Sequence, residues 1–280
     1  MDAEPLNYLT ESPPKRKMPA ILDQIVASTR ATLPALKARS RQLEKAAAEA
    51  AAGPPFMAGL RAGSSVALIA EVKRRSPSAG SIREDLDPAT HAERYASAGA
   101  AAISVLTEGS HFGGSIDDLV AVRARVTVPV LRKDFIVDEL QLVEARATGA
   151  SAALLIVRIL PPKRLEALLR FTRGLGLEAL VETHTQAEID VALAAGAEII
   201  GVNSRDLDTF ALDPDGAWEL LALLPTGPLA VAESAMQTRA DVDKAAAAGA
   251  DAVLIGTALS AAADPGALAR SFSTVVRRGR

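Results

Sequence analysis

The sequence contains no cysteine, and only three of its 280 residues are histidines. Without cysteine the chain forms no disulfide bond, has no thiolate nucleophile and offers no cysteine ligand to a metal. His91, His111 and His184 are far apart in the sequence. We therefore predict no histidine-rich metal site.

Aromatic residues are also scarce, at 3% of the chain, although 49% of the residues are hydrophobic. The core must then be built from Ala, Val, Leu and Ile. No apolar run is long enough to cross a bilayer, and the net charge of −3 gives no reason to expect a nucleic-acid or anionic-membrane partner. Because the N-terminus is acidic and lacks a continuous apolar stretch, we expect no secretory signal and a cytoplasmic protein.

The first 60 residues differ from the rest in pattern. Residues 1–17 look like a poorly ordered tail whose basic triplet, Lys15-Arg16-Lys17, is solvated. From Ile21 to about Ala52 apolar residues recur at helical spacing, and we expect Pro34 at a break between two helices. Gly53-Pro54-Pro55 should end this helical segment.

After this extension, short aliphatic runs alternate with longer Ala-rich stretches. The runs that we predict to be strands are Val66–Val72, Ala102–Leu106, Val128–Leu131, Ala152–Val157, Glu178–Val181, Ile199–Val202, Leu229–Ala232 and Ala252–Ile255. Each interval is long enough for one helix, as in the βαβ units of a parallel sheet. The pattern predicts an α/β fold, a (β/α)8 TIM barrel over residues 61–280, with residues 1–60 as a tail and helical extension.

A weak internal repeat supports the barrel. Gly-Ala follows a predicted helix and precedes a strand at Gly99, Gly149, Gly196 and Gly249, where glycine suits the left-handed residue that ends many helices. The alternative is an open doubly wound sheet, which normally carries a glycine-rich dinucleotide turn after its first strand. Here the first strand continues into the charged stretch from Glu71 to Pro77, so we favour the barrel.

Charged side chains stand at the carboxyl ends of several predicted strands. They are Glu71 and Lys73, then Lys133, Glu182, Arg205 with Asn203, and Glu233. In a closed barrel these ends meet at one mouth, where burial and mutual charge shift pKa values toward acid–base use. A ring of structural ion pairs is the alternative.

The third strand ends in three charges, Arg132, Lys133 and Asp134. A strand buried on both faces has no place for three charges, so we expect all of them where the strand leaves the core. A solvated loop is the alternative interpretation.

Small residues follow the last two strands, at Ser234-Ala235 and Gly256-Thr257. In barrels this is the usual position of a phosphate, although tight turns alone would also explain them. Ser76 gives weaker support for a phosphate contact. Phe112, beside two glycines, is expected either to cover a flat substrate or to pack within its loop. We interpret His184 as an ordinary loop residue.

Several motifs together resemble indole-3-glycerol phosphate synthase, an enzyme family of tryptophan biosynthesis. They are Ala70–Ser78, Ser104–Glu108, Leu131–Ile136, Gly201–Leu207 and Val231–Ser234. The resemblance covers nearly the whole chain from about Ile21, and the motifs occur in the family's order. It implies that the N-terminal helices pack over the barrel mouth.

The resemblance also implies a carboxy-lyase reaction. The family cyclises 1-(2-carboxyphenylamino)-1-deoxyribulose 5-phosphate to indole-3-glycerol phosphate, with loss of carbon dioxide and water. Lys133 matches the family's general acid and Glu182 its general base. Lys73 matches a lysine implicated in binding the carboxylate and in acid catalysis.

The same resemblance assigns the surrounding positions. Glu71, Asn203 and Glu233 match residues that orient the lysines and the substrate hydroxyls. Arg205 matches a residue near the anthranilate portion. The family's phosphate-loop positions are matched by Ser76, Ser234, Gly256 and Thr257. The apolar walls around its aromatic ring are matched by Phe112, Leu154 and Leu207. We expect no metal, no cofactor, a small phosphorylated substrate as partner, and a monomer.

One position departs from the family pattern, which usually has Glu-Ser-Gly after the seventh strand. This chain has Glu233-Ser234-Ala235. A backbone N–H survives that change, but a positive φ is tolerated less well by alanine, so we expect an altered phosphate affinity.

Two other functions compete with the synthase. Phosphoribosylanthranilate isomerase resembles it in fold and substrate but uses a cysteine, which this chain lacks. A catalytically silent barrel that binds a phosphorylated ligand would be expected to have lost Lys133 or Glu182, and both are present.

Overall fold

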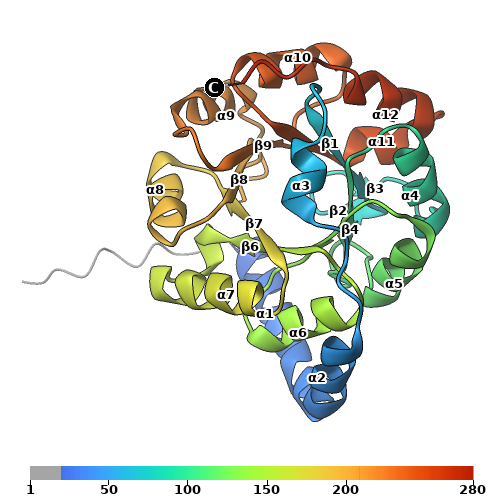
Figure 1. Cartoon of the computed structure of the whole chain (residues 1–280), viewed down its shortest axis with the longest axis vertical. Helices are drawn as coiled ribbons and strands as arrows, with labels where there is room; N and C mark the ends of the chain where they lie inside the picture. The colour runs from blue at the N-terminus through green and yellow to red at the C-terminus, as the bar shows by residue number, and fades with distance from the viewer. Residues whose placement is uncertain (1–19, 208, 280) are drawn as a thin grey trace, which may run out of the picture.

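The centre of the molecule is a closed barrel of parallel strands (Figure 1). The computed structural model describes residues 20–207 and 209–279. The barrel strands are β1 (Ala67–Val72), β4 (Ala102–Leu106), β5 (Val130–Lys133), β6 (Ala152–Ile156), β7 (Glu178–Thr183), β8 (Ile199–Asn203), β9 (Leu229–Glu233) and β10 (Ala252–Ile255). Neighbours in the chain are neighbours in the sheet, and β1 pairs with β10 to close it. The predicted (β/α)8 barrel is confirmed.

Helices surround the barrel on its outside, one in most of the intervals between strands (Figure 1). They are α4 (Pro88–Ser97), α5 (Ile116–Arg125), α6 (Glu139–Ala147), α7 (Pro162–Gly174), α8 (Gln186–Ala194), α9 (Pro214–Leu223), α10 (Arg239–Ala247), α11 (Thr257–Ala261) and α12 (Pro265–Ser273), with a 3-10 turn η1 (Val157–Ile159). The repeated glycines Gly99, Gly149, Gly196 and Gly249 all have positive φ, between 79° and 96°. Their predicted role as left-handed helix ends is confirmed.

The core is aliphatic, as the composition predicted. Alanine, valine, leucine and isoleucine from the strands and the inner helix faces form most of one buried cluster. Only a few aromatic side chains join it, among them Tyr95, Phe56 and Phe272. Over residues 20–207 and 209–279, no helix combines the length and apolar character that spanning a membrane requires.

Arg132 corrects one prediction about β5. It is 4% exposed and lies 3.0 Å from Asp134 Oδ2 and 3.0 Å from Glu144 Oε2 of α6. Arg132 therefore lies inside the protein, and the expectation that all three charges sit where the strand leaves the core is wrong. Two carboxylates compensate the buried guanidinium, while the pleat turns the adjacent Lys133 toward the barrel interior.

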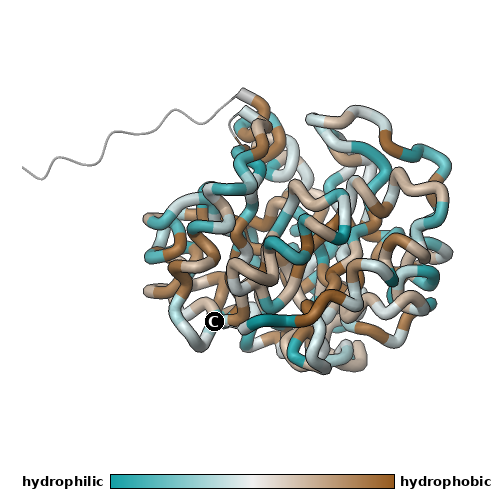
Figure 2. Tube along the Cα trace, turned by 90° about the horizontal axis from the view of Figure 1, so that it is seen from above, coloured by the Kyte–Doolittle hydropathy of each residue, from teal (hydrophilic) through white to brown (hydrophobic). Residues whose placement is uncertain are grey.

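The N-terminal extension consists of α1 (Ala20–Ala38), α2 (Ser40–Glu49) and α3 (Phe56–Arg61). Helix α1 lies at the mouth end, where Ser28 Oγ is 2.9 Å from Ser110 Oγ in the loop after β4. Figure 2, a view at 90° to Figure 1, shows the start of α1 rising above one end of the barrel. Helix α2 then packs on the outside against α6. The expected tail of residues 1–17 lies outside the described residues.

Helix α3 was not predicted, because Gly53-Pro54-Pro55 indicated only the end of the helical segment. It covers the opposite end of the barrel, where Met57 N donates to Glu178 Oε2 at 3.1 Å at the start of β7. Phe56 and Leu60 are fully buried there. Helix α3 lies in front of the barrel in Figure 1, so the mouth faces away from the viewer.

Pro34 does not separate two helices, and that prediction is wrong. It lies inside α1, and the break falls at Arg39 instead. Pro34 leaves the carbonyl of Arg30 without its helical donor, but both residues are exposed, so water can solvate that carbonyl. Packing of Leu33 and Leu36 against α2 and α6 holds the helix together across the proline.

Replacing Pro34 should therefore stabilise the protein. Pro34→Ala restores a backbone N–H to α1 and should raise the free energy of unfolding by about 1–3 kcal/mol. Denaturant titration followed by circular dichroism measures the change. Pro162→Ala is the matched control, because Pro162 is exposed and opens α7, where no helical hydrogen bond is lost. A loss of stability in Pro34→Ala would contradict this account of α1.

Candidate active site

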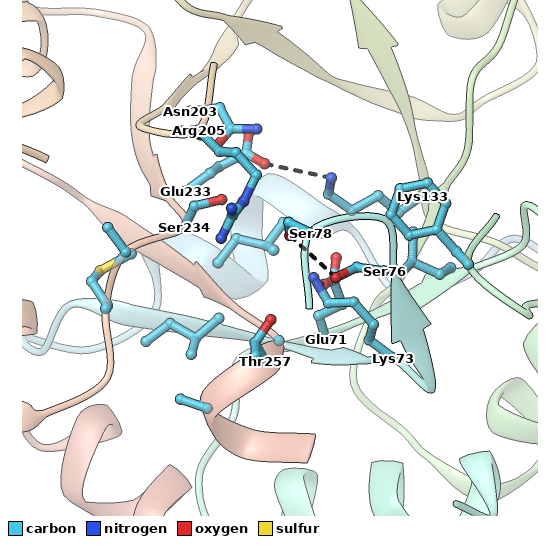
Figure 3. Close-up of a pocket in the computed structure, with 18 of the residues that line it drawn as sticks. Glu71, Lys73, Ser76, Ser78, Lys133, Asn203, Arg205, Glu233, Ser234 and Thr257 are labelled. Carbon is cyan, nitrogen blue, oxygen red and sulfur yellow. Dashed lines mark hydrogen bonds and ion pairs between the residues drawn. The ribbon is translucent and has the colours of Figure 1, made fainter. Parts of the chain in front are cut away.

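A cavity of about 480 Å³ opens at the mouth of the barrel. All fourteen side chains and glycines that the sequence analysis assigned to the site line it: Glu71, Lys73, Ser76, Phe112, Lys133, Leu154, Glu182, Asn203, Arg205, Leu207, Glu233, Ser234, Gly256 and Thr257. Figure 3 shows Lys133 and Lys73 approaching this chamber from one side and Asn203, Arg205 and Glu233 from the other. The cavity has the size of a small-molecule site.

Lys73 and Glu71 form the first ion pair of the chamber. Both lie at the end of β1, and Lys73 Nζ is 2.7 Å from Glu71 Oε1. Glu71 is 2% exposed and Lys73 17%. A Cβ at Gly256 would overlap the Glu71 carboxylate, so glycine at the end of β10 makes room for this pair.

Lys133 lies opposite two further carboxylates. Its Nζ is 3.4 Å from Glu182 Oε2 on β7 and 3.9 Å from Glu233 Oε2 on β9. Both glutamates are almost completely buried. A Cβ at Gly201 of β8 would overlap the Glu233 carboxylate, so only glycine leaves room for that carboxylate here.

The charges in the chamber determine one another's protonation. Burial opposes the charged form of Lys133, but Glu182, Glu71 and Glu233 outweigh it and raise the pKa of Lys133. Burial likewise opposes ionisation of Glu182, yet Lys133 and His184 hold its pKa well below the usual range. Lys133 and Glu182 are therefore an ammonium and a carboxylate at neutral pH.

Glu233 behaves differently from its neighbours. Burial and the repulsion of Glu182 raise the pKa of Glu233 to about 8, against the attraction of Lys133. Among the described residues, neither carboxyl oxygen of Glu233 has a hydrogen-bond partner. At neutral pH the group is mostly a neutral acid whose polar atoms remain available to a bound ligand.

Asn203 is the last residue of β8, and Arg205 follows it two positions later. The two side chains lie close together in Figure 3. Asn203 Nδ2 donates to Glu182 Oε1 at 3.1 Å, and Asn203 Oδ1 accepts from Arg205 N at 3.0 Å. The Arg205 guanidinium donates to Phe210 O at 3.0 Å. Burial lowers the pKa of Arg205.

His184 lies in the loop between β7 and α8, as predicted, but its side chain is buried. Its side chain is 3% exposed, with Nε2 3.4 Å from Glu182 Oε1 and Nδ1 3.2 Å from Glu188 Oε2. Its position two residues after Glu182 in an extended segment places both side chains on one face. The same spacing of two residues separates Glu71 and Lys73 at the end of β1.

Small residues after β9 and β10 form another part of the wall. Ser234 and Ala235 both have positive φ, 67° and 55°, which few residues other than glycine adopt. The two residues line the cavity at the position where barrels commonly bind a phosphate. Thr257 begins α11 beside them, and Ser76 lies across the chamber.

Apolar side chains complete the cavity. Leu154 is buried on β6, and Phe112 and Leu207 come from the loops after β4 and β8. The ring of Phe135 lies 6.0 Å from that of Phe112. Phe135, in the Leu131–Ile136 motif, was not predicted to line the site. Together these residues provide an apolar wall.

No cluster of three or more His, Asp or Glu side chains with the arrangement of a metal site occurs within residues 20–207 and 209–279. The polar groups in the cavity are instead paired ammonium and carboxylate groups. Such pairs can donate and accept protons, and the small-residue loops can bind an anion.

A closed parallel barrel with a charged chamber at the carboxyl ends of its strands defines a (β/α)8-barrel enzyme. The family model "Indole-3-glycerol phosphate synthase" matches residues 22–272. The chain belongs to this family.

Curated relatives named as this synthase are similar in sequence to this chain over most of their own length. Indole-3-glycerol phosphate synthase of Mycobacterium ulcerans is 48% identical over 256 residues, which cover 91% of this chain and 94% of the relative. Indole-3-glycerol phosphate synthase 2 of Streptomyces coelicolor is 52% identical over 220 residues, 78% of this chain and 85% of the relative.

Solved structures with little sequence similarity share the fold. The 3-hexulose-6-phosphate synthase of Salmonella typhimurium superposes with a TM-score of 0.61 at 16% identity, over 74% of this chain and 97% of that chain. Thiamine phosphate pyrophosphorylase of Pyrococcus furiosus gives 0.57 at 14% identity, over 74% and 93%.

The positive φ of Ala235 generates a stability prediction. Ala235→Gly should raise the free energy of unfolding by about 1 kcal/mol, because glycine carries no Cβ penalty in the left-handed region. Urea titration measures the difference. Ala195→Gly is the matched control: Ala195 ends α8 with φ −75°, so glycine there should cost about 0.5–1 kcal/mol. Equal effects of the two substitutions would contradict the strain at Ala235.

The raised pKa of Glu233 generates a pH prediction. Between 4.5, the ordinary pKa of a glutamate, and the folded value of about 8, the folded protein binds more protons than the unfolded chain, so this group lowers stability as pH rises. Glu233→Gln removes that loss, so the variant should gain stability relative to the unsubstituted protein from pH 5 to pH 9.

Urea unfolding at pH 5, 7 and 9 measures this gain. Glu219→Gln, at an exposed glutamate of α9, serves as the control. If the difference between Glu233→Gln and the unsubstituted protein were the same at all three pH values, Glu233 would have an ordinary pKa.

Proposed function

We propose that this chain closes the indole ring of indole-3-glycerol phosphate. Its substrate is 1-(2-carboxyphenylamino)-1-deoxyribulose 5-phosphate, and the reaction releases carbon dioxide and water. The observation that carries the proposal is that Lys73, Lys133 and Glu182 face one buried chamber in a chain of this family. Lys133 is a protonated ammonium group and Glu182 an ionised carboxylate, which supports their roles as acid and base in a proton-transfer reaction.

Lys133 is the general acid for ring closure in this proposal. The ring carbon that bears the carboxylate attacks the C2′ carbonyl, and the carbonyl oxygen takes a proton from Lys133. The surrounding glutamates keep Lys133 protonated at neutral pH, so the proton is in place before the substrate arrives. Loss of carbon dioxide then restores the aromatic ring.

Dehydration needs a base and a second proton donor. Glu182 accepts the amine proton, and its lowered pKa ensures that it is ionised beforehand. Lys73, held by Glu71, binds the substrate carboxylate and takes part in acid catalysis.

The remaining residues bind and orient. Glu71, Asn203 and Glu233 orient the lysines and the substrate hydroxyls, and the Glu233 carboxyl, which has no hydrogen-bond partner among the described residues, supports this role. Arg205 lies near the anthranilate portion. The proposed phosphate contacts are Ser76, Ser234, Gly256 and Thr257. The proposed apolar contacts are Phe112, Leu154 and Leu207.

We assign residues 61–280 to the barrel and the chain up to residue 60 to the extension. We also propose a monomer that acts in the cytoplasm on a small phosphorylated molecule, with neither metal nor cofactor.

The two competing functions make different products. An isomerase of the same pathway would rearrange phosphoribosylanthranilate, and a silent barrel would only bind a phosphorylated ligand. Only the synthase produces an indole fluorophore from its substrate. Appearance of indole fluorescence after addition of the substrate therefore distinguishes the three.

Lys133→Ala should lower kcat by about 10²-fold or more, the effect of losing a general acid. The initial rate of indole fluorescence measures it, and circular dichroism checks the fold. Lys163→Ala, at an exposed lysine in the first turn of α7, is the matched control and should leave kcat unchanged. Near-normal turnover of Lys133→Ala would remove Lys133 from its role.

A further inference from the structure

We propose that His184 is the positioning residue of Glu182, and that Glu188, Arg158 and Asp206 extend this support to the loop between β8 and α9. The inference rests on the proposed function, in which Glu182 is the base. It concerns a line of alternating charges that leads away from the chamber, from the buried Glu182 and His184 to the partly exposed Asp206.

The Glu182 carboxylate is held on both oxygens. Its Oε2 lies 3.4 Å from Lys133 Nζ. Its Oε1 accepts from Asn203 Nδ2 at 3.1 Å and lies 3.4 Å from His184 Nε2. The contacts with Lys133 of β5 and Asn203 of β8 are hydrogen bonds, whereas the contact with His184 is an ion pair without hydrogen-bond geometry. Together the three contacts restrict the rotation of the carboxylate. A base must present its lone pair along one direction to accept a proton efficiently.

Glu188, in the first turn of α8, holds His184 from the other side. Its Oε2 accepts from the backbone N of His184 at 2.7 Å and lies 3.2 Å from Nδ1 of the same residue. The backbone N of Glu188 in turn donates to Thr185 Oγ1 at 3.2 Å. The imidazole therefore has both nitrogens facing carboxylates, and its ring orientation is fixed by the start of α8.

The line continues to a substrate-facing loop. Glu188 Oε1 lies 3.0 Å from Arg158 Nε, and Arg158 Nη1 lies 3.2 Å from Asp206 Oδ2. Asp206 shapes its loop by accepting from Thr209 N at 2.8 Å through Oδ1, and its carbonyl accepts from Phe210 N at 2.8 Å. The same loop carries Arg205 and Leu207, which line the cavity. The base and this loop are thus joined by buried and half-buried ion pairs.

The charged groups around His184 favour its cationic form. Those that face it or its two carboxylates are Glu182, Glu188, Lys133, Arg158 and, farther into the chamber, Glu233. Burial lowers the pKa of His184, but the contacts with Glu182 and Glu188 outweigh it and raise that pKa to about 9. At neutral pH the imidazolium keeps Glu182 ionised, and after Glu182 takes up a proton it favours the release of that proton.

The first experiment compares His184→Leu with His184→Gln in the full chain, with indole formation as the assay. His184→Leu should lower kcat by about tenfold or more and leave KM nearly unchanged, because the base is misplaced while the binding groups remain. His184→Gln keeps an amide donor toward Glu182 and should recover most of kcat. His91→Leu removes a different buried histidine, on α4, and should leave kcat unchanged.

The second experiment tests the other end of the line. Glu188→Gln should lower kcat at alkaline pH, because His184 then loses its proton at a lower pH. Asp190→Asn is the matched control: Asp190 lies on the same helix in an exposed pair with Gln186, at 2.9 Å and the same i,i+4 spacing, and should have no effect. Glu188→Gln also carries the test if His184→Leu does not fold.

A nuclear magnetic resonance titration of the three histidines needs no substrate. One imidazole should titrate near pH 9 in the unsubstituted protein, and its pKa should fall in Glu188→Gln. This signal with no indole product would leave the arrangement intact and remove the proposed function. Wild-type kcat in His184→Leu, a change confined to KM, or no imidazole that titrates well above pH 7 would overturn the role of His184.

Discussion

Mutual compensation of buried charge at the barrel mouth is the constraint on which the rest of the site depends. Moving an ammonium or a carboxylate out of water costs several kcal/mol unless an opposite charge lies close by. Lys133 and Glu182 satisfy this condition at 3.4 Å, and Lys73 and Glu71 at 2.7 Å. Glu233 shares Lys133 with Glu182, at the longer distance of 3.9 Å, and it keeps its proton over most of the neutral range.

This compensation requires close approach of the backbone. Gly201 and Gly256 stand where any side chain would overlap the carboxylates of Glu233 and Glu71. Most of the charged groups lie on strands and Lys73 directly follows one, so their separations depend on the hydrogen-bonded register of the barrel. The loops contribute to the apolar wall and form the turns proposed to bind an anion. In barrel enzymes such loops are the part of the structure that varies.

Much of this arrangement could be predicted from the sequence. The eight strands were recognisable from their aliphatic runs, and the convergence of Lys133 and Glu182 followed from the carboxyl ends of parallel strands. Other features depended on packing between distant segments. From the sequence Arg132 looks like a residue of the barrel mouth, and only the structure shows that Glu144 of α6 neutralises it inside the protein. Helix α3 is so short that its apolar pattern was a weaker signal than the prolines before it, which indicated a break. His184 was missed although its spacing from Glu182 placed both on one face.

The sequence by itself determined the fold class, the strands and the residue types at the mouth, because hydrophobic periodicity and chain order are local properties. It also showed that alanine stands where the family usually has glycine. Only the tertiary structure decided that Ala235 adopts a positive φ, that Pro34 stays within a helix and that Glu233 holds its proton. Each of these features depends on which residues from other parts of the sequence pack nearby and on how far water is excluded. The order of residues along the chain does not reveal either of these conditions.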